Sequence, residues 1–151
     1  MEDNKREKVL SKEYVIEQGV NFDKHLAYGG MHDLEIVEFD RENNEKQFTG
    51  LAYDLFKNGN VDSYMFVKEG IKQGEFVEFY PNGNIKRINN MVDNVSEGKQ
   101  VEYYENGSIM LLEERSGGFL LTFTKYDEQG NIIEEKKEPT EFDKMMVRKF
   151  G

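Results

Sequence analysis

A turn-forming dipeptide recurs at an almost constant interval along most of this chain of 151 residues. Its four copies are Asn58-Gly59, Asn82-Gly83, Asn106-Gly107 and Gln129-Gly130. The numbers of successive glycines differ by 24, 24 and 23. Asn-Gly between runs of β-branched and aromatic residues is a strong hairpin signal, and a fixed period indicates a repeat architecture. The spacing therefore predicts a β-hairpin that is repeated four times.

The second copy indicates which kind of turn to expect. Pro81 precedes Asn82-Gly83. Proline suits the first central position of a type I turn, because its ring holds φ at the required value. Glycine can then take the left-handed conformation that follows. We expect a three-residue loop with a G1 bulge and Gly83 at positive φ. Upstream, Gly50, Gly74 and Gly98 keep a second common phase, which Gly117-Gly118 break by four positions.

This turn places large apolar residues opposite one another on one face of each hairpin. The predicted cross-strand pairs are Leu55 with Val61, Phe79 with Ile85, Tyr103 with Ile109, and Tyr126 with Ile132. A two-residue turn would instead pair Asp127 with Ile132. Because cross-strand apolar pairs stabilise a sheet, we take the four pairs as the repeating core.

The opposite face next to the turns is half acidic and half aromatic. It carries Asp54, Phe56, Glu78, Tyr80, Glu102 and Tyr104. If these residues are exposed, they have the composition of an interface for a basic partner, with aromatic anchors and acidic neighbours. If a terminal segment covers them, the aromatics are second-layer core. The two interpretations stay open from the sequence.

An open stack of hairpins has two exposed edges, and the C-terminal residues 139–151 offer a way to cover one. Thr140 can cap a helix, and Asp143 stands at the capping-box distance. Apolar residues then recur at helical spacing at Phe142, Met145, Met146 and Phe150. We expect an amphipathic helix from Thr140 to Phe150 that packs these side chains on the last hairpin and blunts its edge.

Residues 1–46 are less regular. Lys5 to Gln18 can form a helix stopped by Gly19, Leu34 to Phe39 form a strand by composition, and Asp40 to Glu45 form a worn turn. This segment is a degenerate first repeat or a cap. The chain is then one mainly β domain: an N-terminal cap (1–46), an antiparallel meander of repeated hairpins (47–138) and a C-terminal capping helix (139–151).

Composition and charge indicate the cellular location of the protein and the class of partner that it can bind. The sequence contains no cysteine, starts with a polar stretch instead of a secretory leader, and has no long apolar run, so we expect a cytoplasmic protein. Its net charge of −10 is divided as −5 over residues 1–48, −6 over 49–138 and +1 over 139–151. Acidity of this kind disfavours nucleic acid and membrane surfaces and attracts basic proteins.

The sequence gives no support to an enzyme, a metal site or a cofactor. The only histidines, His25 and His32, stand in no ligand or triad pattern. Neighbouring carboxylates such as Glu134-Glu135 point to opposite faces of a strand, which makes shared acid–base work unfavourable. The acidic stretch Asp40 to Glu45 lacks the central glycine of a calcium loop. We therefore predict a non-enzymatic protein.

The repeat resembles the MORN-repeat family in its variant form, in which a glycine, a short aromatic strand and x-Asn-Gly-x-Ile/Val return with a period of about 24. More narrowly, residues 48–59 and 79–86 resemble the YwqK-like antitoxins of bacterial toxin–antitoxin systems. The resemblance covers residues 47–138. It implies an antitoxin or immunity protein that binds a cognate, basic toxin and neutralises it by occlusion. The alternative is a MORN-repeat scaffold for protein–protein interaction that neutralises nothing.

Overall fold

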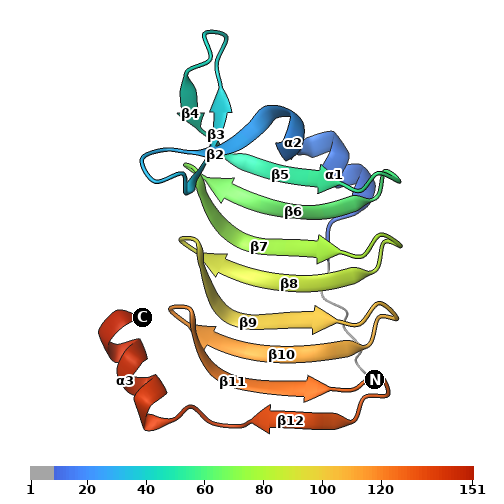
Figure 1. Cartoon of the computed structure of the whole chain (residues 1–151), viewed down its shortest axis with the longest axis vertical. Coiled ribbons are helices and arrows are strands. Elements are labelled where there is room, and N and C mark those ends of the chain that lie inside the picture. The colour runs from blue at the N-terminus through green and yellow to red at the C-terminus, as the bar shows by residue number, and fades with distance from the viewer. Residues whose placement is uncertain (1–8) are drawn as a thin grey trace.

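The computed structural model describes residues 9–151, and its main element is a nine-stranded sheet in the order β1-β5-β6-β7-β8-β9-β10-β11-β12 (Figure 1). The four predicted hairpins supply its eight antiparallel strands. These strands are β5 (Gly50–Leu55), β6 (Val61–Lys68), β7 (Ile71–Phe79), β8 (Ile85–Val92), β9 (Val95–Tyr103), β10 (Ile109–Ser116), β11 (Phe119–Tyr126) and β12 (Ile132–Lys136). The predicted fold class, a mainly β meander of hairpins with a C-terminal helix, is confirmed.

The Asn-Gly turns have the predicted geometry. In the second hairpin, the Gly83 N–H donates to the Tyr80 carbonyl and the Tyr80 N–H donates to the Asn84 carbonyl, which is a type I turn followed by a G1 bulge. The four turn glycines have φ between 89° and 95°. The asparagine contributes its side chain, because Asn82 Oδ1 accepts the Asn84 N–H at 2.9 Å. In the fourth turn, where Gln129 replaces asparagine, Asp127 Oδ1 accepts the Asn131 N–H instead.

All four predicted cross-strand pairs are present. They are Leu55 with Val61, Phe79 with Ile85, Tyr103 with Ile109, and Tyr126 with Ile132. The register shifts beside each pair, which is the expected bulge.

At the opposite side of the sheet, neighbouring hairpins are joined by a second type of turn. Glu69-Gly70, Asp93-Asn94 and Gly117-Gly118 each have two consecutive residues at positive φ, as a type I′ turn requires. These turns follow one another with the same period as the Asn-Gly turns. The sequence interpretation of Gly117-Gly118 as a break in phase is therefore wrong, since the pair continues the series of Gly70 and Asn94.

Two faces of the sheet differ in what they carry. The apolar face holds the four cross-strand pairs and a buried central row of Tyr53, Tyr64, Val77, Ile88 and Val101. The open face lies opposite, and its middle holds Glu78, Arg87, Asn89, Gln100 and Glu102. Alternation along each strand separates the two sets.

The N-terminal segment covers the first hairpins on the apolar face. Helix α1 (Lys12–Gln18) begins after Ser11, whose side chain accepts the Tyr14 N–H, and buries Val15. The predicted helix does not reach back through residues 9–11, which are not helical, and Leu10 donates its N–H to the Tyr64 hydroxyl at 3.0 Å. The part of that prediction before residue 9 lies outside the described residues.

Residues 20–47 form a cap instead of a fifth repeat. Strand β1 (Val20–Asn21) pairs parallel with β5, and α2 (Phe22–His25) leads into a separate three-stranded sheet, seen at the top of Figure 1. Its strands are β2 (Leu26–Gly29), β3 (Glu35–Phe39) and β4 (Glu45–Gln47). Leu26 and Ile36 of this cap are buried with Ala52, Met65 and Val67, so the cap covers the first hairpin on the open face.

Helix α3 (Glu141–Phe150) has the predicted capping box, in which Thr140 and Asp143 exchange side-chain to backbone hydrogen bonds. It packs against β11, and Lys136 of β12 reaches Asp143 at 2.6 Å. The predicted packing of Phe142 and Phe150 on the sheet is wrong, since these side chains are 63% and 65% exposed. The Lys136–Asp143 ion pair and the short loop before α3 hold this helix beside the strands. The helix does not lie along the outer edge of β12, a strand that carries charged side chains.

Candidate protein-binding surface

Tyrosines of the second and third turns join each hairpin to the next. The Tyr80 hydroxyl donates to the Tyr103 carbonyl at 2.8 Å, and the Tyr104 hydroxyl donates to the Tyr126 carbonyl at 2.7 Å. Phe56 holds the equivalent position in the first turn and has no hydroxyl. Each tyrosine ring is half-buried and held at both ends, so its rotamer freedom is already lost before any partner arrives.

Turn asparagines form a parallel ladder. Asn60 Nδ2 donates to the Pro81 carbonyl at 2.8 Å, and Asn84 Nδ2 donates to the Glu105 carbonyl at 2.8 Å. With the tyrosine bonds, they fix the spacing of neighbouring turns. The edge formed by the turns is therefore a rigid surface although it consists of loops.

The predicted acids Glu78 and Glu102 are bridged by a residue that the sequence analysis did not single out. Arg87 lies between them on the open face and binds Glu78 at 2.9 Å and Glu102 at 3.2 Å. Burial lowers the pKa of Arg87, but the hydrogen bonds and charges of Glu102 and Glu78 outweigh burial and raise it. The cluster carries one net negative charge, so these two acids contribute less to the surface potential than the sequence suggested.

Asp54 lies apart from this cluster, beside the cap. It accepts the Asp23 N–H at 3.2 Å and lines a shallow cleft of about 440 Å³ together with Asp62 and Lys24. Burial and the neighbouring charges of Asp62 and Asp23 raise the pKa of Asp54 above its ordinary value, although the Asp23 N–H opposes the shift. Its place at the first hairpin separates it from Glu78 and Glu102.

Tyr80 and Tyr104 share an open cleft of about 600 Å³ on the turn edge. Its lining consists of Tyr80, Asn82, Tyr104, Glu105, Asn106 and Glu128. Two carboxylates and no basic side chain are in this lining. Burial raises the pKa of Tyr80, and the charges of Glu102 and Glu105 add to the shift. Sequence reasoning missed Glu105 and Glu128, although alignment of the turns puts both at the position after Tyr104 or Asp127.

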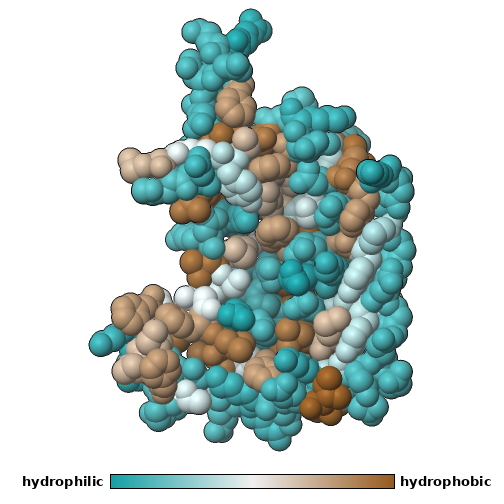
Figure 2. Space-filling model, viewed as in Figure 1, coloured by the Kyte–Doolittle hydropathy of each residue, from teal (hydrophilic) through white to brown (hydrophobic). Residues whose placement is uncertain are grey.

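The open face itself is hollowed. Figure 2 shows the hollow between the three-stranded sheet above and α3 below, with hydrophilic residues gathered in its middle. Gln100 in this floor is 4% exposed and holds the Asn90 backbone through its side-chain oxygen and nitrogen. Gln100 in the floor of the hollow is thus a buried polar group whose side-chain amide is hydrogen-bonded.

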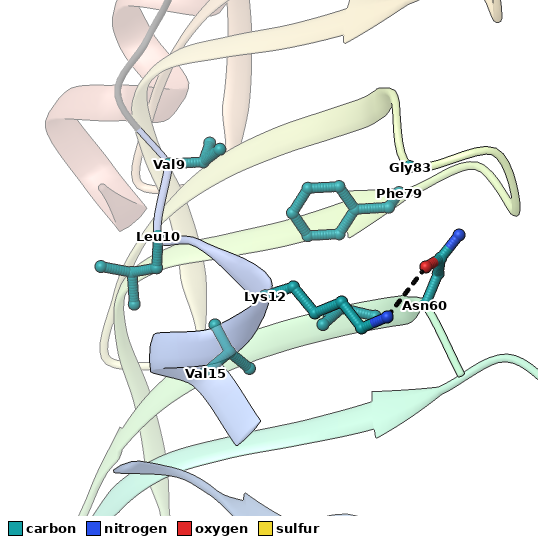
Figure 3. A pocket seen from close by; sticks show the side chains of 8 residues that line it. Val9, Leu10, Lys12, Val15, Asn60, Phe79 and Gly83 are labelled. Carbon is teal, nitrogen blue, oxygen red and sulfur yellow. Dashed lines mark hydrogen bonds between the residues drawn. The ribbon is translucent and has the colours of Figure 1, made fainter. Parts of the chain in front are cut away.

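The apolar face carries a different cleft (Figure 3). It measures about 210 Å³ and is lined by Val9, Leu10, Lys12, Val15, Asn60, Val61, Phe79 and Gly83. Lys12 Nζ donates to Asn60 Oδ1 at its rim at 3.2 Å. A second cleft of about 320 Å³ shares Val9, Phe79 and Gly83 and extends to Ile85 and Tyr103.

Comparison with protein families bears on the repeat. Two of the hairpins match the MORN repeat variant. The matched residues are 72–93 and 96–114, which coincide with the β7–β8 and β9–β10 hairpins. Neither a curated protein nor a solved structure matches the chain. The MORN repeat variant suggests a protein-interaction scaffold and is in general not catalytic.

Two further observations concern residues 9–151. In that part of the chain, no three histidine or carboxylate side chains are grouped to hold a metal ion. None of the helices described is long and apolar enough to cross a membrane.

Proposed function

We propose that this chain is a non-enzymatic antitoxin or immunity protein that binds a basic bacterial toxin one-to-one and neutralises it by occlusion. The observation that carries the proposal is the turn-edge cleft, in which Tyr80 and Tyr104 are held rigid beside Glu105 and Glu128. Aromatic side chains with few remaining degrees of freedom are favoured interface anchors, and carboxylates steer a cationic partner.

The six residues expected from the sequence keep distinct roles in this proposal. Phe56, Tyr80 and Tyr104 supply affinity, and Asp54, Glu78 and Glu102 supply steering. Since Arg87 neutralises part of the charge of Glu78 and Glu102, we assign Glu105 and Glu128 the larger share of the steering. The net charge of −10 supports a basic protein partner over nucleic acid or membrane, and a cytoplasmic location belongs to the same proposal.

The direct experiment is co-expression in bacteria with the product of the neighbouring reading frame. If that product arrests growth, this chain restores growth, and the purified pair elutes as a one-to-one complex in size-exclusion chromatography with light scattering. Arrest that persists in the presence of well-expressed chain contradicts neutralisation. A one-to-one complex with a neighbour that is not toxic would favour the second candidate function, a cytoplasmic scaffold, which the MORN-variant match supports.

Kinetics of the complex separate the two roles. Glu105→Lys with Glu128→Lys should slow association, most strongly at low salt, because exposed charges act on the encounter rate. Glu13→Lys with Glu17→Lys, on α1, is the control of equal charge change. Tyr104→Ala should speed dissociation by roughly 30-fold, since truncating an aromatic anchor costs about 2 kcal/mol. Tyr104→Phe keeps the ring but loses the hydrogen bond that holds it, so it should speed dissociation by much less than Tyr104→Ala does. Equal effects of both charge pairs would place the interface elsewhere.

A further inference from the structure

The charge at one position of the turns changes sign along the repeat. The residue before the Asn-Gly or Gln-Gly dipeptide is Lys57 in the first turn, Pro81 in the second, Glu105 in the third and Glu128 in the fourth. Both glutamates are exposed and line the turn-edge cleft, whose lining contains no basic side chain. Neither forms an ion pair with another residue in the range 9–151. The cleft between the third and fourth turns therefore keeps two carboxylates that the described part of the chain does not neutralise.

The open face shows how this sheet binds two carboxylates at the same separation. Glu78 of β7 and Glu102 of β9 are one repeat apart, and Arg87 of β8 bridges them at 2.9 Å and 3.2 Å, one through each terminal nitrogen. Glu105 and Glu128 are also one repeat apart, in the turns that follow β9 and β11. Each pair is separated by two strands, roughly 9.6 Å at the usual strand spacing. A guanidinium that bridges one pair therefore has the right size to bridge the other.

Tyrosine rings on the turn edge are suited to contact with a cation. Lys86 Nζ lies 5.9 Å from the centre of the Tyr80 ring. In the next repeat, Met110 holds the position equivalent to Lys86, and within the described chain no cation lies over the Tyr104 ring. The hydrogen bond to the Tyr126 carbonyl fixes the orientation of this ring. The ring of Tyr104 is therefore open to a cation from outside the chain, next to the two carboxylates.

A metal ion and a lysine side chain are poorer occupants of this cleft. Calcium and magnesium take about six or more oxygen ligands, and in residues 9–151 no three histidine or carboxylate side chains are grouped to hold a metal ion. A lysine ammonium is a compact charge that pairs with one of two separated carboxylates at a time. A guanidinium carries its N–H donors in a rigid planar fork and also stacks on aromatic rings. The arrangement of two carboxylates and one ring therefore favours arginine.

We propose that the turn-edge cleft takes an arginine side chain of the partner protein, whose guanidinium bridges Glu105 and Glu128 and stacks on the Tyr104 ring. This arginine is the counterpart of Arg87, supplied by the partner instead of by the chain itself. The cleft volume of about 600 Å³ leaves room for the side chain and the backbone that carries it. The inference rests on the proposed function in taking a basic protein to bind at this edge, and it names the residue type that this protein inserts.

The test measures binding of a single side chain to the full chain by NMR. The probe is N-acetyl-arginine N-methylamide, in which the arginine side chain lies between two neutral amide groups. At low salt it should cause saturable shifts of the backbone amide signals of residues 104–106 and 128–130. The matching lysine compound should bind roughly fivefold more weakly, because it loses one exposed ion pair and the planar stacking. The uncharged citrulline compound should cause no saturable shift.

Three results of this titration overturn the proposal. They are equal binding of the arginine and lysine compounds, absence of a saturable shift with the arginine compound, and saturable shifts that map to another part of the chain. Preference for arginine at residues 104–106 and 128–130 supports it.

Charge-removing variants locate the bridge. Glu105→Gln and Glu128→Gln change exposed side chains, so both should keep the wild-type melt. Because a bridge needs both carboxylates, each single variant should weaken arginine binding to about the level of the lysine compound, and the double variant should abolish saturation. Glu13→Gln with Glu17→Gln, on α1, removes the same charge as the double variant and should leave binding unchanged. Equal losses in the two double variants would mean that the probe responds to general charge, and the proposal fails.

No toxin enters these measurements, so their outcome is distinguishable from that of growth rescue. Rescue without arginine binding would remove the arginine site and leave the proposed function standing. Arginine binding without rescue would remove neutralisation and leave an arginine-binding surface on a scaffold.

Discussion

The first two hairpins and the last two are copies of one pattern, but they are buried very differently. Among the buried apolar residues in the range 9–151, only Val101 belongs to the last two hairpins. In the described part of the chain, α1 covers the first two hairpins on the apolar face, and β2 and β3 cover the first hairpin on the open face. Helix α3 packs beside β11 of the last hairpin. The comparison teaches that the repeat determines backbone geometry, while segments outside the repeat determine burial.

The largest expected difference lies in the central row of the apolar face. Ile88 and Leu112 occupy equivalent positions in successive repeats, but Ile88 is 2% exposed and Leu112 is half-buried. Ile88→Ala should lower the free energy of unfolding by about 2–5 kcal/mol, as for a buried aliphatic residue. Leu112→Ala should lower it by roughly 1–2 kcal/mol, since less surface is lost. Urea denaturation measures both, and equal losses would remove the contrast between the hairpin pairs.

The turns should show the opposite behaviour. Gly83 and Gly130 have φ of 95° and 89°, and neither has atoms within 4 Å of where a Cβ would stand. Gly83→Ala and Gly130→Ala should therefore each cost about 1–2 kcal/mol from backbone strain alone. The values should agree in the covered and the open hairpin. A much larger loss at Gly83 would mean that the turn depends on its surroundings, which thermal melts of the two variants can decide.

A smaller effect should follow from the tyrosine bonds between hairpins. Tyr104→Phe removes the hydroxyl that donates to the Tyr126 carbonyl and should cost about 0.5–1.5 kcal/mol. In the first turn, Phe56→Tyr adds a hydroxyl at the equivalent position, where the Phe79 carbonyl corresponds to the acceptor, and should stabilise by up to the same amount. Denaturant midpoints measure both changes. Loss of stability on adding the hydroxyl would show that the first hairpin pair is spaced differently.

The smallest effect is a local pH dependence at the C-terminal end. The hydrogen bond from Lys136, then that from the Thr140 N–H, lower the pKa of Asp143 from 3.8 to about 2. Because the pKa falls on folding, the stabilisation of α3 is present above pH about 4 and is lost as the pH falls toward 2. NMR signals of α3 should lose their dispersion in that range before those of β7 and β8. Asp143→Asn should remove this early step, and an unchanged titration would contradict the assignment.

What could be predicted from the sequence is what local chemistry decides. Asn82-Gly83 with Pro81 defines a turn, and Thr140 with Asp143 defines a helix start, because the interacting atoms are close together along the chain. The helix start at Ser11 carries the same kind of local signal, since its side chain accepts the Tyr14 N–H, and the sequence analysis missed it. The contact of Leu10 with Tyr64 could not be found in this way, because the two residues are far apart in the sequence.

The candidate site was predictable only in part. Alignment of the repeats places Tyr80 and Tyr104 at equivalent positions. The same alignment could have identified Glu105 and Glu128 as further members of the candidate surface. The sequence did not reveal that Arg87 bridges Glu78 and Glu102, because strand alternation places residues on a face without giving their ion pairs. The exposure of Phe142 depends on where α3 docks, which helical periodicity does not encode.

The bonds between neighbouring turns make the sheet a structure of adjustable length. The second hairpin donates to the third from both Tyr80 and Asn84, so residues 72–95 form a segment that could be duplicated within the gene without a new kind of junction. One added copy of this segment would lengthen the sheet by roughly 9.6 Å and leave the cap and α3 as they are. The number of hairpins is therefore a variable that evolution or an engineer can set, and the reach of the binding surface would follow it.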